Sequence, residues 1–264
     1  ADHANASKQM FLSSMSHNIR TPMNGIMGMI KIASDHTDDP ERVKDCLDKA
    51  AFSGHQLLSV LNEIMDISQI KSGSLNLRAE AFSLSDLMEE VVSSIISSVR
   101  DKGLELKIHP MQVRHEDILG DRQRLQQIFL NILGNSVKYT PSGGLIEISV
   151  IEHEQGSAEH SCESYDLIFT DNGVGMDEEF TQHIFEPFSH AYNPSVNHLD
   201  GVGLGISIAQ NIARMMGGSI SVKSAPGQGT QFTVTVILRL QDPSECLSDQ
   251  TDPEHDEDVS DISF

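Results

Sequence analysis

The sequence predicts an all-α helical hairpin, able to form a dimeric four-helix bundle, followed by an α/β domain built as a two-layer sandwich. Apolar residues recur at helical spacing in two runs that the turn-like stretch DHTDDP (35–40) separates. After residue 80, helical patterns alternate with short segments rich in β-branched residues, which are typical of strands. Three glycine clusters lie in this second part.

The hairpin is predicted over residues 1–75. The apolar residues of its first helix are Phe11, Met15, Ile19, Met23, Ile26, Met27 and Ile30. Those of its second helix are Leu47, Ala50, Leu57, Leu58, Leu61, Ile64, Met65 and Ile67. Gly73 is expected to cap the end of the second helix. Each apolar face is wider than one partner helix can cover, so we expect a homodimer that buries the remainder.

The α/β domain is predicted over residues 76–240. Residues 83–99 are expected to form a helix with Ser83 or Ser85 as its N-cap, and residues 121–138 form another. Alternating patterns predict five strands, at 104–110, 145–151, 165–170, 219–224 and 231–240. A third helix is expected to begin at GVGLGI (201–206) and to run to Met216.

Composition limits the classes of protein and partner. With 38% hydrophobic and 22% charged residues, the chain is expected to be soluble. It lacks the roughly 18 consecutive apolar residues of a membrane span, and because ADHANASKQM contains no apolar run, no signal peptide is expected there. A net charge of −21 argues against a nucleic-acid partner, because a phosphate backbone selects clustered Lys and Arg. These features predict a cytoplasmic segment, and Cys46, Cys162 and Cys246 are expected to be reduced thiols without a metal.

The last residues, 241–264, form an acidic tail. They hold nine Asp or Glu residues and no Lys or Arg, with few large apolar residues. Such a segment cannot bury enough apolar surface to fold, so we expect a disordered tail or linker.

The glycine clusters are DNGVGM (171–176), GVGLGI (201–206) and GQGT (227–230). One glycine-rich stretch is most often just a turn, but three of them indicate a phosphate-binding surface, since backbone N–H groups at a helix start favour anions. The P-loop pattern G-x-x-x-x-G-K-[ST] is absent, and GVGLGI does not fit a dinucleotide fingerprint because its glycines are spaced G-x-G-x-G after a polar stretch.

The order of DRQRLQQIFLNILGNSVKYT (121–140), DNGVGM, IFEPF (184–188), GVGLGI and GQGT resembles the ATP-binding domain of sensor histidine kinases. That domain has the Bergerat fold, shared with gyrase-type ATPases and certain chaperones. ANASKQMFLSSMSHNIRTP and LLSVLNEIMDISQIKSGSL resemble the dimerisation and phosphoacceptor hairpin of hybrid and membrane sensor kinases. The resemblance covers residues 7–240.

This resemblance implies ATP and Mg²⁺ as cofactors. Asn135 is implied as the Mg²⁺ ligand, with Asn131 on the same helix face, because a hard cation takes oxygen donors. The side chain of Lys138 would contact the phosphates of ATP, and the ring of Tyr139 would pack near the nucleoside.

The resemblance also implies that the residues of the glycine clusters bind the adenine and the phosphates of ATP. Asp171 is similar to the family's aspartate whose carboxylate accepts a hydrogen bond from the exocyclic amine of adenine. The other implied ATP-binding residues are Gly173 and Gly175, which leave room for the base, Thr230, which completes its pocket, and Gly203, Leu204 and Gly205 near the phosphates. Residues 189–200 would form a mobile lid.

His17 is the candidate phosphoacceptor. A neutral imidazole nitrogen is nucleophilic near pH 7 when the other nitrogen holds the proton. Thr21 lies at i+4 on the same helix face, and Pro22 lacks an N–H, so a local bend is expected there. Asn18 stands where the family has Glu or Asp, so it could accept a hydrogen bond from the ring but could not take a proton.

The predicted function is ATP-dependent autophosphorylation of His17. The phosphoryl group is then transferred to an aspartate of a response-regulator receiver, in cis or in trans. A phosphatase activity through Thr21 is also expected. Asn18 leaves a second interpretation open, an ATP-binding pseudokinase or phosphatase-biased scaffold. A third, a Bergerat-fold ATPase or chaperone, is disfavoured by the hairpin. The resemblance further implies a membrane-tethered parent protein, with this segment at the inner face of the membrane.

Overall fold

The computed structural model describes the backbone of residues 2–153, 162–187 and 203–241, and their side chains except those of residues 2–14 and 17. Four predictions lie outside the described residues: the lid at 189–200, the acidic tail beyond residue 241, the state of Cys246, and the side chain of His17.

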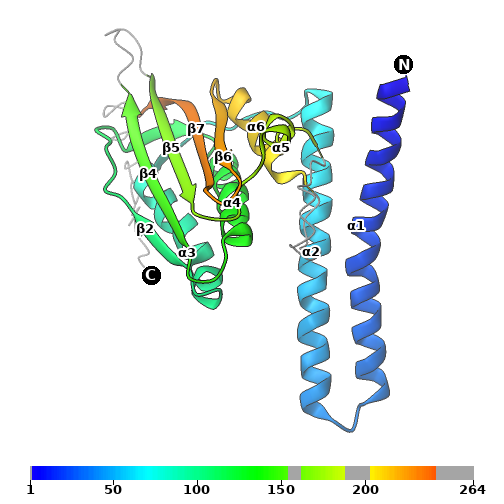
Figure 1. Ribbon diagram of the computed structural model, residues 1–264. Helices are drawn as coiled ribbons and strands as arrows, with labels where there is room; N and C mark the ends of the chain where they lie inside the picture. The colour runs from blue at the N-terminus through cyan, green and yellow to red at the C-terminus, as the bar shows by residue number, and fades with distance from the viewer. Residues whose placement is uncertain (1, 154–161, 188–202, 242–264) are drawn as a thin grey trace, which may run out of the picture.

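Two long helices, α1 (Asp2–Asp35) and α2 (Pro40–Ser72), form the predicted antiparallel hairpin (Figure 1). The side chain of Asp39 accepts a hydrogen bond from the N–H of Arg42 and so caps the start of α2. Gly73 ends α2 in the left-handed conformation, with φ 66°, as the sequence predicted. Helix α1 continues through Pro22.

Much of the hairpin's apolar face stays uncovered in one chain. Eight large apolar side chains of α1 and α2 are between 40% and 65% exposed: Met23, Met27, Ile30, Leu47, Phe52, Leu58, Leu61 and Met65. This exposure agrees with the prediction that one partner helix covers only part of each face.

The second part of the chain, here called the sheet domain, contains a seven-stranded sheet with the order β1-β3-β7-β5-β4-β2, and β6 also pairs with β7. The strands are β1 (Glu80–Ser83), β2 (Glu105–Ile108), β3 (Asp117–Gly120), β4 (Leu145–His153), β5 (Cys162–Asp171), β6 (Ser219–Ala225) and β7 (Gly229–Leu240). All pairs are antiparallel except β2 with β4.

Helices α3 (Leu84–Asp101), α4 (Arg122–Tyr139) and α6 (Gly205–Met215) supply the second layer (Figure 1). Their apolar faces and alternate strand residues form one buried core, in which the rings of Phe129 and Phe169 lie 5.7 Å apart. Every second residue of β5 is buried, which agrees with the helices of the described ranges covering one face of the sheet. The two-layer prediction is therefore confirmed, as is Ser83 as the N-cap of α3.

Three short elements were not predicted: β1, β3 and α5 (Glu178–His183). The strand expected at 104–110 is shorter, since only Glu105–Ile108 pairs with β4. Cys46 is buried and Cys162 is half-buried, and among the described residues neither forms a disulfide. Within the described ranges, no group of His, Cys, Asp or Glu is arranged to hold a metal ion, and no helix is both long and apolar enough to cross a bilayer.

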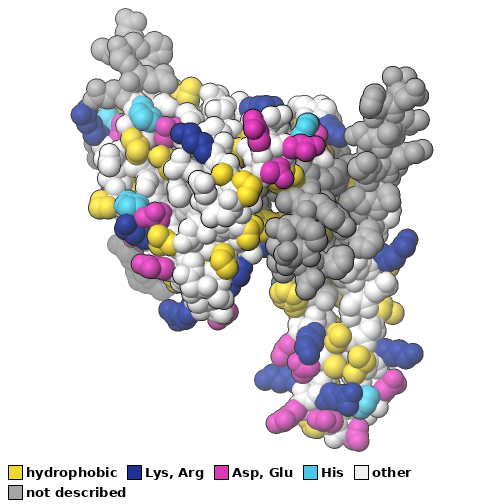
Figure 2. Space-filling view, in the orientation of Figure 1, with side chains coloured by type: hydrophobic (Ala, Val, Ile, Leu, Met, Phe, Trp, Pro, Cys, Tyr) yellow, Lys and Arg dark blue, Asp and Glu magenta, His cyan; other side chains and the backbone are white. Residues whose placement is uncertain are grey.

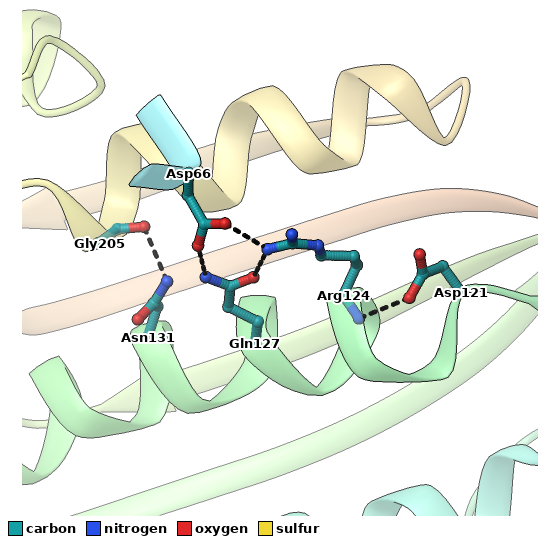
Figure 3. A network of polar contacts seen from close by, with 6 residues as sticks. All are labelled: Asp66, Asp121, Arg124, Gln127, Asn131 and Gly205. Atoms are coloured by element: carbon teal, nitrogen blue, oxygen red, sulfur yellow. Dashed lines mark hydrogen bonds and ion pairs between the residues drawn. The ribbon is translucent and has the colours of Figure 1, made fainter. Parts of the chain in front are cut away.

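The hairpin meets the sheet domain through α2. The carboxylate of Asp66 accepts hydrogen bonds from Arg124 (2.7 Å) and Gln127 (2.6 Å) of α4, as Figure 3 shows. Beside it, Ile67 is 5% exposed and belongs to the core of the sheet domain. The hairpin and the sheet domain are therefore joined both by hydrogen bonds and by apolar packing.

Glu63, one turn before Asp66, gives this contact a pH dependence. Burial raises the pKa of Glu63 to about 7, and the charge of Asp66 adds to the rise, while a bond from Ser59 opposes it. Since this folded-state pKa lies above the unfolded value near 4.5, the stability it contributes is present below pH 4.5 and is lost as the pH rises through 7.

We expect Glu63→Gln, which cannot ionise, to stabilise the chain at pH 8 by about 2 kcal/mol and to change little at pH 5. Denaturant titrations at the two pH values measure this difference. Glu89→Gln, at an exposed position on α3, is the control and should show no such difference. Equal effects of Glu63→Gln at both pH values would contradict the prediction.

Candidate functional site

Asp171 is the buried acceptor of the site. It ends β5 opposite Thr230 of β7 and is 6% exposed. Its carboxylate accepts hydrogen bonds from the Ser136 hydroxyl of α4 and from the N–H of Gly173, both at 3.0 Å. Burial raises the pKa of Asp171, and the bonds from Gly173, Ser136 and the Thr230 backbone partly oppose that rise. The result is a fixed acceptor in a region of low dielectric.

The clusters DNGVGM and GQGT pack directly against each other behind Asp171. Gly175 has φ 67°, and a Cβ at this position would lie 1.9 Å from the Ala225 carbonyl oxygen. The N–H of Gly227 donates to the Val174 carbonyl oxygen at 2.7 Å. Gly173 lies against the Tyr139 carbonyl oxygen, 2.8 Å from where its Cβ would be. Glycine is required because backbone meets backbone here.

The third glycine cluster, GVGLGI, is held against α4. The Asn131 side chain of α4 donates to the carbonyl oxygen of Gly205 at 3.0 Å (Figure 3). Leu204 is fully buried, and Gly203 has φ 70°. Leu204 occupies the N-cap position of α6 and cannot cap the helix with its apolar side chain. The first N–H groups of α6 are therefore suited to an anion.

The remaining predicted residues lie at the end of α4 and, for Thr230, on β7. Asn135 is half-buried one turn after Asn131. The ammonium group of Lys138 lies 5.0 Å from the centre of the Tyr139 ring. The Thr230 hydroxyl forms a 2.9 Å hydrogen bond with the Ser224 hydroxyl. The described members of the predicted ATP set thus lie on α4, at the strand ends and at the start of α6.

Sequence reasoning missed two buried polar residues, one at each end of α4. Ser136 is 2% exposed and fixes one oxygen of Asp171. Asp121 is 7% exposed and caps α4 through the N–H of Arg124 at 3.0 Å. A usable signal was available for Ser136, which follows Ile132 by one turn on the apolar face of α4, where a polar group needs a partner.

The hairpin residues lie apart from these strand ends. His17 lies within helix α1, and its neighbour Asn18 is half-buried, while Thr21 is exposed and Pro22 is buried. Among the described residues, the hairpin's main contact with the sheet domain comes from α2 rather than α1.

The donor set fits a purine nucleotide. A buried carboxylate can accept from an exocyclic amine, glycine backbone leaves space for a flat base, and the start of α6 offers N–H groups to phosphate. The Asn135 amide oxygen is a ligand type that Mg²⁺ accepts.

Comparison with known proteins gives matches for both parts. Residues 120–240 match the family described as histidine kinase-, DNA gyrase B- and HSP90-like ATPase, and residues 7–73 match the His Kinase A (phospho-acceptor) domain. The chain is 36% identical over 229 residues to the autoinducer 2 sensor kinase/phosphatase LuxQ of Vibrio harveyi. The chain belongs to the sensor histidine kinase family.

The LuxQ match covers 87% of the chain and 26% of LuxQ. BarA of Escherichia coli K12, a signal transduction histidine-protein kinase, is 33% identical over 91% of the chain and 26% of BarA. The chain therefore spans about a quarter of the length of these histidine kinases.

Solved histidine kinases share the fold. Full-length ShkA, in complex with AMPPNP, matches with a TM-score of 0.62 and 25% identity over 88% of the chain and 46% of ShkA. AdeS of Acinetobacter baumannii matches with a TM-score of 0.59 and 19% identity over 86% of the chain and 98% of AdeS. These likenesses agree with the hairpin and two-layer sheet described above.

Proposed function

We propose that this chain is the catalytic core of a two-component kinase, which transfers the γ-phosphoryl group of ATP to His17 and then to an aspartate of a response-regulator receiver. The observation that carries the ATP part is the buried carboxylate of Asp171 among three converging glycine clusters. The family of residues 7–73 carries the phosphoacceptor part.

Each residue of the proposed ATP site has a role that depends on its position. Asp171 accepts from the adenine amine, with Gly173, Gly175 and Thr230 around the base. The backbone N–H groups of Gly203, Leu204 and Gly205, together with Lys138, bind phosphate oxygens, and Tyr139 packs near the nucleoside. Asn131 holds the start of α6 in place. Bound through Asn135, Mg²⁺ would neutralise charge on the phosphates.

His17 supplies the nucleophile. Its Nε2 attacks the γ-phosphorus, the bond to the β-phosphate oxygen breaks, and ADP leaves with that oxygen's charge. The ring can act only when Nδ1 carries the proton, so a neighbour must accept a hydrogen bond from Nδ1–H. Asn18 can do so through its amide oxygen, without the charge assistance that a carboxylate gives.

We expect Asn18→Glu to raise the rate of His17 phosphorylation at least tenfold, because a positioned acid–base group contributes about 10²–10⁴-fold. Initial rates at saturating ATP measure this effect. Asn18→Gln, which lengthens the side chain without adding charge, is the control. A rise smaller than tenfold would show that Asn18 does not limit the chemistry.

A phosphatase activity is the second candidate function, favoured by Thr21 one turn after His17 and by the name of LuxQ, a sensor kinase/phosphatase. The Thr21 hydroxyl would orient water against the phosphorylated receiver, a step that needs no proton withdrawal from His17. Thr21→Ala is expected to slow dephosphorylation of the cognate receiver at least tenfold, whereas Thr21→Ser should retain most of it. Unchanged dephosphorylation in Thr21→Ala would exclude this role.

Three kinds of partner are proposed: a second copy of this chain, a response-regulator receiver and a membrane. A second copy would cover the exposed apolar side chains of α1 and α2 in a four-helix bundle. The receiver would dock near His17, in cis or in trans, and the parent protein would be tethered to a membrane.

Incubation with γ-labelled ATP and Mg²⁺, followed by acid and base challenge, tests the kinase. We expect an acid-labile, base-stable label that His17→Gln abolishes. ATP binding without any label would favour the pseudokinase or phosphatase-biased scaffold that Asn18 suggests.

A further inference from the structure

The last turn of α4 has backbone carbonyl groups that the helix itself does not satisfy. The Ser136 carbonyl oxygen accepts from the N–H of Thr140 at 3.1 Å. The next carbonyl group, that of Val137, would take the N–H of residue 141, but Pro141 has none. Thr140 is extended, with φ −86° and ψ 125°, so the chain leaves the helix before it can return a donor to Lys138. The carbonyl groups of Val137 and Lys138 therefore need donors from elsewhere.

Lys102, at the end of α3, supplies these donors. Its ammonium group donates to the carbonyl oxygens of Val137 at 2.7 Å and of Lys138 at 2.6 Å. On the face drawn in Figure 2, several Lys and Arg side chains of the sheet domain lie beside Asp or Glu side chains. Lys102 is instead half-buried against backbone, and burial lowers the pKa of its ammonium group. A cation is favoured here because the C-terminal end of a helix carries partial negative charge.

The end of α3 fixes the backbone of Lys102. Gly103 follows it in the left-handed conformation, with φ 66°. The N–H of Leu104 then donates to the Val99 carbonyl oxygen at 2.9 Å, which is the bonding typical of a chain that reverses after a helix. Leu104 is 9% exposed and belongs to the core. The ammonium group therefore reaches α4 from an anchored position.

The last turn of α4 also contacts the DNGVGM cluster. The Tyr139 carbonyl oxygen accepts from the N–H of Val174 at 3.3 Å. Just beyond the turn, the N–H of Leu145 donates to the side-chain oxygen of Asn172 at 2.8 Å. A shift of the turn would therefore change its contact with this glycine cluster.

The turn that Lys102 holds carries three side chains of the proposed nucleotide site. The Ser136 hydroxyl donates to the Asp171 carboxylate at 3.0 Å. The Lys138 ammonium group lies 5.0 Å from the centre of the Tyr139 ring, and both side chains are proposed to contact ATP. A shift of about 1 Å in this turn would break the bond from Ser136, because hydrogen bonds do not extend beyond about 3.5 Å. The position of the turn therefore decides whether these groups can bind the nucleotide together.

We propose that Lys102 is a positioning residue for ATP, because its two hydrogen bonds hold the last turn of α4 where the turn's side chains can bind the nucleotide. This inference rests on the proposed ATP-binding function. Lys102 acts through the backbone of α4, so it affects the binding of ATP rather than the transfer to His17. A contact that strengthens nucleotide binding is itself strengthened by the nucleotide to the same extent.

The first test compares three variants of the full chain. Lys102→Met removes the charge and the donors but keeps a long apolar side chain, whereas Lys102→Arg can still donate to both carbonyl oxygens. Lys107→Met is the matched control, since Lys107 pairs with Glu147 on the surface at 3.1 Å. Calorimetric titration measures AMPPNP affinity, initial rates give KM and kcat for His17 phosphorylation, and denaturant titration gives the free energy of unfolding.

We expect Lys102→Met to weaken AMPPNP binding and to raise the KM for ATP about tenfold, with kcat within about twofold of the parent chain. Lys102→Arg should bind AMPPNP within about threefold of the parent chain, and Lys107→Met should bind it equally well. A purely structural cap would lower the free energy of unfolding without changing the KM of the folded protein. AMPPNP affinity within about threefold of the parent in Lys102→Met, or a loss of kcat alone, would overturn the proposal.

A second measurement uses the parent chain and so does not depend on the folding of a variant. Lysines are acetylated with acetic anhydride, with and without saturating AMPPNP, and their rates are read by mass spectrometry. We expect AMPPNP to slow acetylation of Lys102 at least about threefold and to leave that of Lys107 unchanged. Equal rates for Lys102 would overturn the positioning role. A parent chain that does not bind AMPPNP would refute the proposed ATP site and this role with it, whereas AMPPNP binding without phosphorylation would refute only the kinase function.

Discussion

Replacement of Asp171 by asparagine is expected to weaken AMPPNP binding about 100-fold while preserving the fold. The introduced amide could still accept from the N–H of Gly173 and could donate to the Ser136 hydroxyl, so these two of the three present contacts keep a partner. It would then offer the adenine amine an N–H group instead of an acceptor. Hydrogen bonds to charged groups contribute about 1.5–3 kcal/mol, and each 1.4 kcal/mol is about a factor of ten in affinity.

Calorimetric titration with AMPPNP measures this change. Asp166→Asn provides the control, because Asp166 lies on the same strand but points to the face without helices, where it accepts from Thr235 at 2.6 Å. It should bind the nucleotide as the parent chain does, and both variants should melt within a few degrees of it. Affinity retained within threefold in Asp171→Asn would remove Asp171 from the site.

The long elements of the fold could be predicted because their signals are local. A helix such as α3 has its apolar stripe and its Ser83 cap within the segment itself. The same holds for β4, β5 and β7, whose alternation extends over nine or more residues. Periodicity of this length identifies the element before any tertiary contact is known.

The short elements lack such a signal. Strands β1 and β3 have four residues each, and they exist because Phe82 pairs with Ile118 and Leu119 pairs with Arg239, both far away in sequence. Four residues are too few to show an alternation, so the pairing partner decides the structure.

The glycine clusters of the candidate site are visible in the sequence, whereas the residues that support the site through tertiary contacts are not. Asp66 shares its helix face with Asn62, Glu63, Gln69 and Ile70, which are mostly polar, so the sequence does not show that its carboxylate has a buried partner. Only the docking of α2 on α4 shows that this partner is Arg124.

Gly175→Ala is expected to destabilise the sheet domain by more than about 3 kcal/mol and to abolish AMPPNP binding. Two costs add at this position. With φ 67°, an alanine there would pay about 1 kcal/mol for the left-handed conformation. Its Cβ would also lie 1.9 Å from the Ala225 carbonyl oxygen, which is backbone and cannot move without separating the DNGVGM turn from the β6–β7 hairpin.

Gly227→Ala separates the two costs. Gly227 lies in that same hairpin with φ 73°, but a Cβ there meets nothing within 4 Å, so only the conformational cost of about 1 kcal/mol applies. Hydrogen exchange of amides in β5 and β7 gives the free energy of opening for each variant. If Gly175→Ala cost no more than Gly227→Ala, the close packing of the two glycine clusters would not be what holds the nucleotide site together.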